Sequence, residues 1–472
     1  MMGRRWDERK QMGMGRPAAV ALAIALAAPL AGAGQRDGSR MRAGGAVLAT
    51  IPVDGGATVI AVDSSSGRVF VAEKGSRAIR GSQAIRVLDA TTGRIVRRIR
   101  LGADPYTLSS GSLPLTPTKL AVDADRNRVY VGTEPPALTV LDGQGRPLGS
   151  APAPGLVAIP ALDARAGRVY VVGIGVPLAG LQLDILDGRT GRLVRATPLG
   201  GPHSPDGVSE SFEGGGLAIA PRAGRIFIGS MTRNVLHVVR LSDGSPIGAV
   251  RIGAATAPPV AVALDDQTRH VFVAASQGRS VYMVDARTGA VLRRVAIPGF
   301  AVPVALAVDP ATRRAFVIGL GPATGKGNPI GAGPGSVAVL DTGTGALLAT
   351  VGVGVGPHAV AIDVQRGRVF VVNAGAVDVR PGRQGVVLDA GSVSVLDARS
   401  GAVRATLSVG LTPESIAIDE RTARAFVVNV GGVVRDSGHR LPPAVRQRFG
   451  AIPTSRVLAV PSSVSVIDTS AT

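Results

Sequence analysis

The sequence predicts an all-β fold, a β-propeller of eight four-stranded blades, on three observations. A unit of four short apolar segments recurs along almost the whole chain. Apolar and polar residues alternate within these segments, which is typical of half-buried β-strands. The chain also begins and ends partway through the unit. Antiparallel strands in groups of four, repeating roughly every 50 residues, are the signature of propeller blades.

Each of the four segments has its own pattern. The first ends in Asp, as in AVAID (359–363), and the third resembles SVSVLD (392–397). The fourth follows a Thr-Gly turn, as in TGALLATVGVG (344–354). Between the first and second segments the spacing from Asp to the next Arg is constant, which indicates a turn capped by the Asp. The second segments begin at residues 68, 128, 168, 225, 270, 314, 368 and 424.

Eight second segments predict eight blades, and seven is the alternative if the weakly matching region 138–163 is not a full blade. The two chain ends supply the last blade. GGAVLATIPVDGG (44–56) matches a fourth segment with nothing before it, and SSVSVIDTSAT (462–472) supplies a third segment with nothing after it. We therefore expect the N-terminal stretch to pair with the C-terminal one and close the ring, which removes free sheet edges.

Composition excludes several kinds of chemistry. The chain has no cysteine, so disulfides, thiol nucleophiles, zinc ribbons, iron–sulfur clusters and CxxCH haem attachment are excluded. A formal net charge of +19 favours anionic partners. Only 3% of the residues are aromatic, too few for the stacking that nucleic-acid binding often uses, so nucleic acid is not expected as a partner.

Residues 1–33 have the pattern of a secretory signal peptide. Several basic residues precede an apolar run at 18–34 that ends in small residues and is too short to span a bilayer comfortably. This predicts a single propeller domain at 34–472, located in the periplasm or outside the cell, with no transmembrane segment after signal removal. Retention of the leader as an anchor is the alternative.

All the long connections fall at two places in the unit. They lie between second and third segments and between a fourth segment and the next first one, at 103–118, 201–216, 320–335, 374–391 and 431–463. In a propeller these two kinds of connection open on the same face. Binding residues concentrate on loops held by a rigid scaffold, so we expect the functional surface there.

The insertion at 431–463 is the most distinctive of these connections because it is strongly basic. It is predicted to be a partner-binding loop, with a solvated excursion as the alternative. Its candidate residues are Arg435, His439, Arg440, Arg446 and Arg448.

A second candidate site lies where first segments begin. His358 and Glu414 occupy equivalent positions in successive units, and Lys119 has a comparable place in the second unit. These three side chains are expected at the mouth of the central channel, where they could bind a ligand or line a wet channel. Weak candidates for a divalent metal are His203, Asp206, Glu210 and Glu213, whose spacing matches no recognised metal motif. No cofactor is expected.

The last units also carry a family resemblance. FVVNAG (370–375), SVSVLDARSGAVRATLSVG (392–410) and LTPESIAID (411–419) resemble the repeat of the YVTN-type and YncE-like β-propellers. The resemblance covers nearly all of 44–472, and the Tyr-Val-Thr-Asn motif is present only as Phe-Val-Val-Asn. It implies an exported bacterial propeller and does not transfer a function, because members of one fold differ widely.

The favoured function is therefore a non-enzymatic binding or scaffold protein. It would engage a partner, a ligand or an anionic envelope polymer through the face with long loops, and it is expected to be a monomer. The alternative is a propeller-type enzyme, such as a metal-dependent lyase or lactonase, with its site at the channel mouth.

Overall fold

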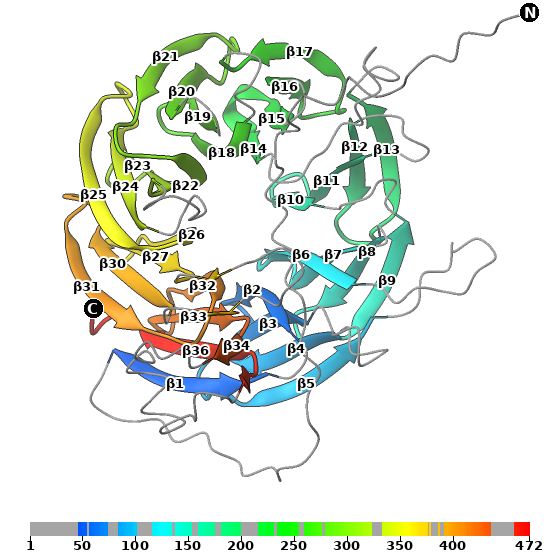
Figure 1. Ribbon diagram of the computed structural model, residues 1–472. Coiled ribbons are helices and arrows are strands. Elements are labelled where there is room, and N and C mark those ends of the chain that lie inside the picture. The colour runs from blue at the N-terminus through cyan, green and yellow to red at the C-terminus, as the bar shows by residue number, and fades with distance from the viewer. Residues whose placement is uncertain are drawn as a thin grey trace, which may run out of the picture.

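The computed structural model is a closed ring of eight four-stranded antiparallel sheets (Figure 1). Each sheet is a blade whose first strand lies nearest the central axis and whose fourth strand lies at the rim. The structure describes residues 46–53, 56–73, 84–101, 116–134, 137–152, 159–174, 181–199, 216–230, 234–253, 259–275, 279–322, 333–375, 377–378, 386–387, 391–435 and 457–472.

Blades 1 to 4 follow one another along the chain. In blade 4 a short 3₁₀ turn, η1 (Pro221–Ala223), joins the first two strands. The strands of these blades are β2 (Ala57–Asp63), β3 (Arg68–Glu73), β4 (Ala84–Asp89), β5 (Ile95–Arg100); β6 (Thr116–Asp123), β7 (Arg128–Glu134), β8 (Ala137–Asp142), β9 (Pro147–Pro152); β10 (Ile159–Asp163), β11 (Arg168–Ile174), β12 (Leu181–Asp187), β13 (Leu193–Pro198); and β14 (Leu217–Ala220), β15 (Arg225–Ser230), β16 (Val235–Arg240), β17 (Pro246–Arg251).

Blades 5 to 8 complete the ring, and the outermost strand of blade 8 is β1 from the N-terminal part of the chain. Their strands are β18 (Pro259–Asp265), β19 (His270–Ala275), β20 (Ser280–Asp285), β21 (Val291–Ala296); β22 (Val302–Asp309), β23 (Arg314–Leu320), β24 (Pro334–Asp341), β25 (Leu347–Val355); β26 (Pro357–Asp363), β27 (Arg368–Asn373), β30 (Ser392–Asp397), β31 (Val403–Ser408); and β32 (Pro413–Asp419), β33 (Arg424–Asn429), β36 (Ser463–Asp468), β1 (Val47–Pro52).

The prediction of eight blades is confirmed, and the alternative of seven is wrong. The eight second strands begin at the eight predicted residues. The weakly matching region 138–163 contributes β8, β9 and β10, so it belongs to two complete blades. The predicted closure is confirmed as well, because β1 pairs antiparallel with β36, with Ile51 opposite Val464. Blade 8 is thus built from both ends of the described chain.

A ninth sheet stands outside the ring. It contains β28 (Val377–Asp378), β29 (Val386–Val387), β34 (Gly432–Arg435) and β35 (Val457–Val460), in that order. The first two strands lie in the predicted loop 374–391 of blade 7, and the last two lie in the basic insertion of blade 8. The sequence predicts a loop here, but the two ends of the insertion pair as an antiparallel hairpin. The hairpin also pairs with β29 from the 374–391 connection of blade 7.

The hydrophobic core is divided among the junctions between neighbouring blades. One cluster, for example, packs Phe70 and Ile85 of blade 1 against Val129 and Val131 of blade 2. The third residue of every second strand is a fully buried aromatic ring that fills such a junction. These rings are Phe70, Tyr130, Tyr170, Phe227, Phe272, Phe316, Phe370 and Phe426.

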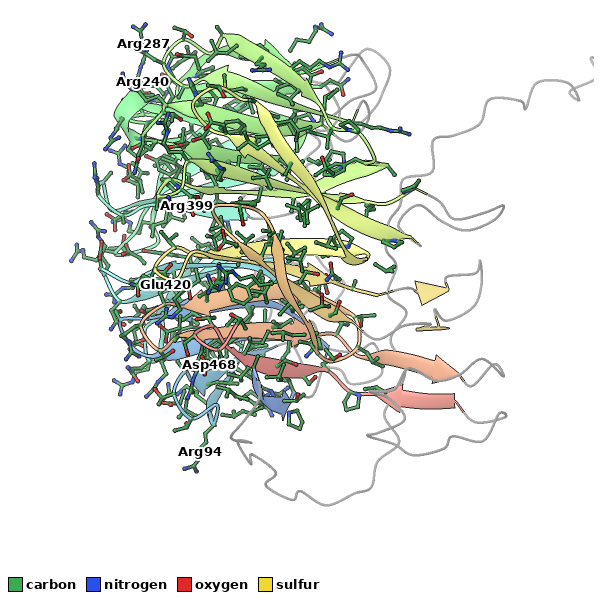
Figure 2. All side chains as sticks on the ribbon, turned by 90° about the vertical axis from the view of Figure 1, so that its left-hand side faces the viewer. Arg94, Arg240, Arg287, Arg399, Glu420 and Asp468 are labelled. Atoms are coloured by element: carbon green, nitrogen blue, oxygen red, sulfur yellow. The ribbon has the colours of Figure 1, made fainter. Side chains whose placement is uncertain are left out.

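The two faces of the ring differ in construction. We call the face with the turns between first and second strands and between third and fourth strands the tight face, and the opposite face the looped face. Figure 2 shows Arg94, Arg240, Arg287 and Arg399 on the tight face, with β28, β29, β34 and β35 on the other side. On the tight face the Asp that ends a first strand caps the turn: Asp163 Oδ1 accepts hydrogen bonds from two backbone N–H groups.

Hydrogen bonds between blades link neighbouring turns of the tight face. A side chain in one blade donates to a backbone carbonyl oxygen in the next, always in the same rotational direction among the bonds described. The bonds run from Arg126 to Ala164, from Arg168 to Ser242, from Arg366 to Glu420, from Arg421 to Ser64 and from Arg424 to Ala90. These bonds tie neighbouring blades together on the tight face.

Candidate functional site

A β-bulge near the start of the first strand shapes the inner wall of the ring. In six blades the pairing of the first and second strands shifts by one residue at the same place. A bulge leaves one residue outside the ladder and re-aims its side chain. The residues at the bulge are Thr58, Thr118, Val260, Val304, His358 and Glu414.

His358 and Glu414 are the two ionisable members of this set, and they lie on β26 and β32 of adjacent blades. Their positions in the two blades are therefore equivalent, as the sequence predicts. Lys119 lies one residue beyond the bulge of β6, paired with Gly132, so its position is comparable and not equivalent. All three belong to innermost strands, at the ends that lead to the looped face.

Lys119 affects the pKa of His358. Burial lowers the pKa of His358, and the positive charge of Lys119 lowers it further, although blades 8 and 1 separate the two residues. Yet the side chains of His358 and Lys119 are both exposed. An imidazole that is exposed to solvent and still surrounded by protein is expected for a residue that faces the axis of a propeller. His358 is thus neutral at pH 7, with one nitrogen that donates and one that accepts.

The other sequence candidates are only partly covered by the structure. Arg435 is the last residue of β34, and its backbone pairs with Val457. The predicted partner-binding and metal candidates His439, Arg440, Arg446, Arg448, His203, Asp206, Glu210 and Glu213 lie outside the described residues. Within the described part of the chain, no group of three His, Asp or Glu side chains could hold a metal ion.

Polar pairs lie inside the blades where the second strands reach the looped face. The amide of Asn373 donates to Ser392 Oγ at 3.1 Å and to Ser394 Oγ at 3.0 Å. Asn429 makes the same bonds to Ser463 and Ser465. The Asn of the FVVN motif and the two serines of the SVSV motif therefore form one structural unit that joins the second and third strands.

Blades 1 and 3 replace this unit with charged side chains that the sequence analysis did not single out. Glu73, at the Asn position of blade 1, is fully buried and forms ion pairs with Arg86 and Arg98. Asp184, at the second serine position of blade 3, is only 2% exposed. The amide of Gln182 donates a hydrogen bond to its Oδ1 at 2.7 Å. The signal was the charged residue inside the otherwise apolar third segments IRVLD and LDILD.

We expect the substitution Asp184→Asn to stabilise the protein at alkaline pH. Burial raises the pKa of Asp184 from 3.8 to about 6. The folded protein then holds the proton more tightly than the unfolded chain, so stability falls as pH rises from about 4 to about 6. Above this window the variant should gain about 2–3 kcal/mol in free energy of unfolding, and near pH 4 it should gain almost nothing.

Urea unfolding at pH 4 and pH 8 measures this difference. Asp187→Asn is the matched control, since Asp187 ends the same strand and hydrogen bonds from Thr190 lower its pKa. That variant should lose stability at pH 8, the opposite sign. Equal stability changes for Asp184→Asn at the two pH values would contradict the prediction.

The fold is similar to that of solved propellers at low sequence identity. The Dos1 propeller aligns with a TM-score of 0.60 and 11% identity, over 89% of this chain and 95% of its own. The C-terminal WD40 domain of Sif2 gives 0.59 and 13%, over 89% and 97%. BamB from Moraxella catarrhalis gives 0.54 and 15%, over 81% and 96%.

No family model matches the sequence, and no curated protein matches it either. The architecture nevertheless defines the class: the chain is a β-propeller with eight blades, like the WD40-type and BamB propellers in fold. At these identities the likeness extends to the fold and not to activity, and the finer resemblance to YVTN-type repeats stays a prediction. No helix in the described part of the chain has the length and apolar character needed to cross a membrane.

Proposed function

We propose that the protein is an exported, non-enzymatic propeller that binds a protein or an anionic envelope polymer through its looped face. The ninth sheet is the observation that supports this most. Its hairpin β34–β35 gives the basic segment 436–456 a paired stem, and the parallel pairing of Val386 with Val433 ties that stem to blade 7. A rigid stem lowers the entropy that a binding segment loses when it docks.

The chemistry of the segment fits an anionic partner. Residues 436–456 contain Arg440, Arg446, Arg448 and Arg456 with a single acid, Asp436. Guanidinium groups bind carboxylates and phosphates in bidentate geometry, and the net charge of +19 would speed encounter with a polyanion.

Lys119, His358 and Glu414 provide a second contact near the axis on the same face. The set combines an amine, an imidazole whose pKa is lowered and a carboxyl group, all from innermost strands. This combination suits a polar ligand group or an extended chain that enters the axis, and we include these three residues in the proposed binding surface.

Deleting the basic segment tests the proposal without disturbing the ring. Because Arg435 and Val457 are cross-strand partners, residues 436–456 can be replaced by an Asn-Gly turn that continues the hairpin. Full chain and variant are immobilised and exposed to the envelope fraction of the source cells at low and moderate salt. We expect a partner retained by the full chain and at least tenfold depleted on the variant, with loss of binding as salt rises.

A second variant keeps the full length of the chain and has Arg440, Arg446 and Arg448 changed to Gln, which separates loss of charge from loss of the segment. If binding depends on charge, this variant fails as the deletion does. Retention of the same components by the full chain and both variants would overturn the proposed docking segment.

A further inference from the structure

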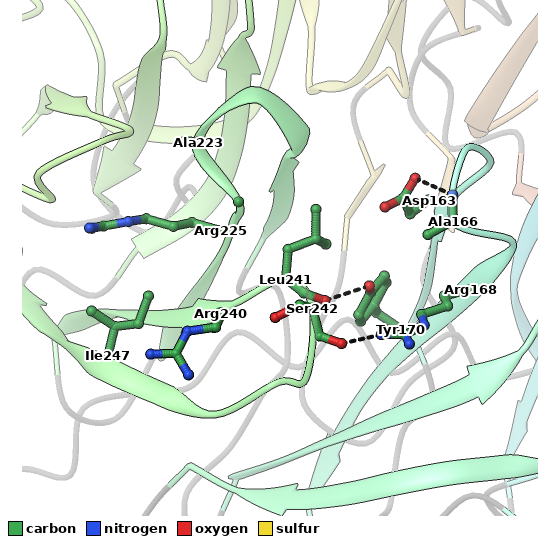
Figure 3. Close-up of a pocket in the computed structure, with 11 residues that line it drawn as sticks. Asp163, Ala166, Arg168, Tyr170, Ala223, Arg225, Arg240, Leu241, Ser242 and Ile247 are labelled. Atoms are coloured by element: carbon green, nitrogen blue, oxygen red, sulfur yellow. Dashed lines mark hydrogen bonds between the residues drawn. The ribbon is translucent and has the colours of Figure 1, made fainter.

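We propose that a groove between blades 3 and 4 on the tight face binds the phosphate group of a ligand. The groove has a volume of about 810 Å³ and lies at the opposite end of the ring from the surface proposed above. Its charged side chains are Arg168, Arg225, Arg240 and Asp163 (Figure 3). Three guanidinium groups against one carboxylate make it a cationic site.

The cationic character comes from one break in an otherwise regular pattern. In seven blades the residue that begins the second strand, an Arg or a His, lies between two aspartates, one ending the first strand and one ending the third. In blade 4 the corresponding residue is Arg225, and its two neighbours are Ala220 and Arg240. Two carboxylates are thus missing and one guanidinium is added at a single place on the ring.

The Arg225–Arg240 pair is expected to lower the stability of the ligand-free protein. Residues directly opposite on antiparallel strands lie side by side on one face of the sheet, and like charges there are destabilising. In other blades the equivalent Arg forms an ion pair with the Asp that ends the third strand. Arg68 pairs with Asp89 at 2.6 Å, and Arg314 pairs with Asp341 at 3.1 Å. Among the described residues, the Arg225 guanidinium has no hydrogen-bond or ion-pair partner.

The other charges around the groove are already engaged. The Asp163 carboxylate accepts two backbone N–H groups of its own turn. Arg168 donates to the carbonyl oxygen of Ser242, as Figure 3 shows. Arg240 donates to Ser245 Oγ at 2.8 Å and lies 3.4 Å from Asp243 Oδ2, a contact between two exposed side chains that solvent weakens.

An oxyanion between the two cross-strand arginines would replace repulsion with two charge-assisted contacts. Figure 3 shows Arg225 and Arg240 extending toward the same side, with Ile247 beside them. Planar guanidinium groups match the oxygens of a phosphate in bidentate geometry, which a spherical halide cannot provide. Ile247 is exposed and offers an apolar surface to an ester group next to the phosphate.

Titration calorimetry of the full chain at low ionic strength tests the inference, with inorganic phosphate and glycerol 3-phosphate as separate probes. We expect saturable binding of at least one probe, and tighter binding of the ester would identify an organic phosphate as the ligand. Arg240→Asp restores the residue found in the other seven blades. It should weaken binding at least tenfold while raising the Tm of the ligand-free protein.

Two further variants keep the outcome interpretable. Arg240→Gln removes the charge without adding a carboxylate and should also weaken binding. Arg399→Asp makes the same charge change in a turn of blade 7, outside the groove, and should change the affinity less than twofold. Absence of saturable binding by the unaltered chain, or an equal loss in Arg399→Asp, would overturn the site. Neither result bears on the basic segment of the looped face.

Discussion

A chain that lacks residues 46–53 is expected to lose most of the stability of blade 8. These residues form β1, the outermost strand of that blade, and they bury Ile51 and Val53 against Val464 and Val466. Full burial of an aliphatic side chain contributes about 2 kcal/mol, so the free energy of unfolding should fall by at least about 4 kcal/mol. The loss also exposes the edge of β36, which should increase aggregation.

Circular permutation separates closure of the ring from simple loss of residues. Joining Thr472 to Ala46 leaves five residues between Asp468 and Val47, the same number as between Asp89 and Ile95 in blade 1. A permutant with β1 attached in this way, and with new ends in another connection, should recover the stability of the full chain. Denaturant unfolding of the three proteins makes the comparison. A truncated chain that unfolds at the same urea concentration as the full chain would contradict the role of β1.

The second large effect is expected at the buried ion pair of blade 1. Arg86→Met should cost about 3–5 kcal/mol at pH 8, because it leaves the carboxylate of Glu73 buried with only the partly exposed Arg98 as a partner. Burial already raises the pKa of Glu73 above 4.5, against the opposing effect of the two arginines. Stability therefore falls as pH rises above 4.5, and the cost of Arg86→Met should be smaller at pH 4.5, where the carboxyl group can take up a proton.

The double variant Glu73→Met/Arg86→Met provides the decisive comparison. Replacing both charged groups with apolar side chains removes the uncompensated charge, so it should recover most of the lost stability. Arg94→Met, at an exposed turn of the same blade, is the control and should change the free energy of unfolding by less than about 0.5 kcal/mol. A double variant as unstable as Arg86→Met would show that the packing of Arg86, and not the isolated charge, matters.

The regular features of the fold could be predicted because they depend on residues close together in the sequence. Alternation of apolar and polar residues specifies a half-buried strand, and the constant interval from Asp63 to Arg68 specifies a turn. Repetition of the unit then gives the number of blades. Even the pairing of the two chain ends follows, because a third segment without a fourth must be completed by a fourth segment without a third.

The candidate sites depended on positions that only the assembled ring fixes. The sequence by itself determined eight blades, their closure, the face with long insertions and the equivalence of His358 and Glu414. The tertiary structure decided that Lys119 acts on His358 across two intervening blades, and that two insertions pair into a ninth sheet. It also placed Arg225 opposite Arg240 beside a groove. The physical reason is that charge interactions and strand pairing depend on distance in space, which strand register and ring closure set.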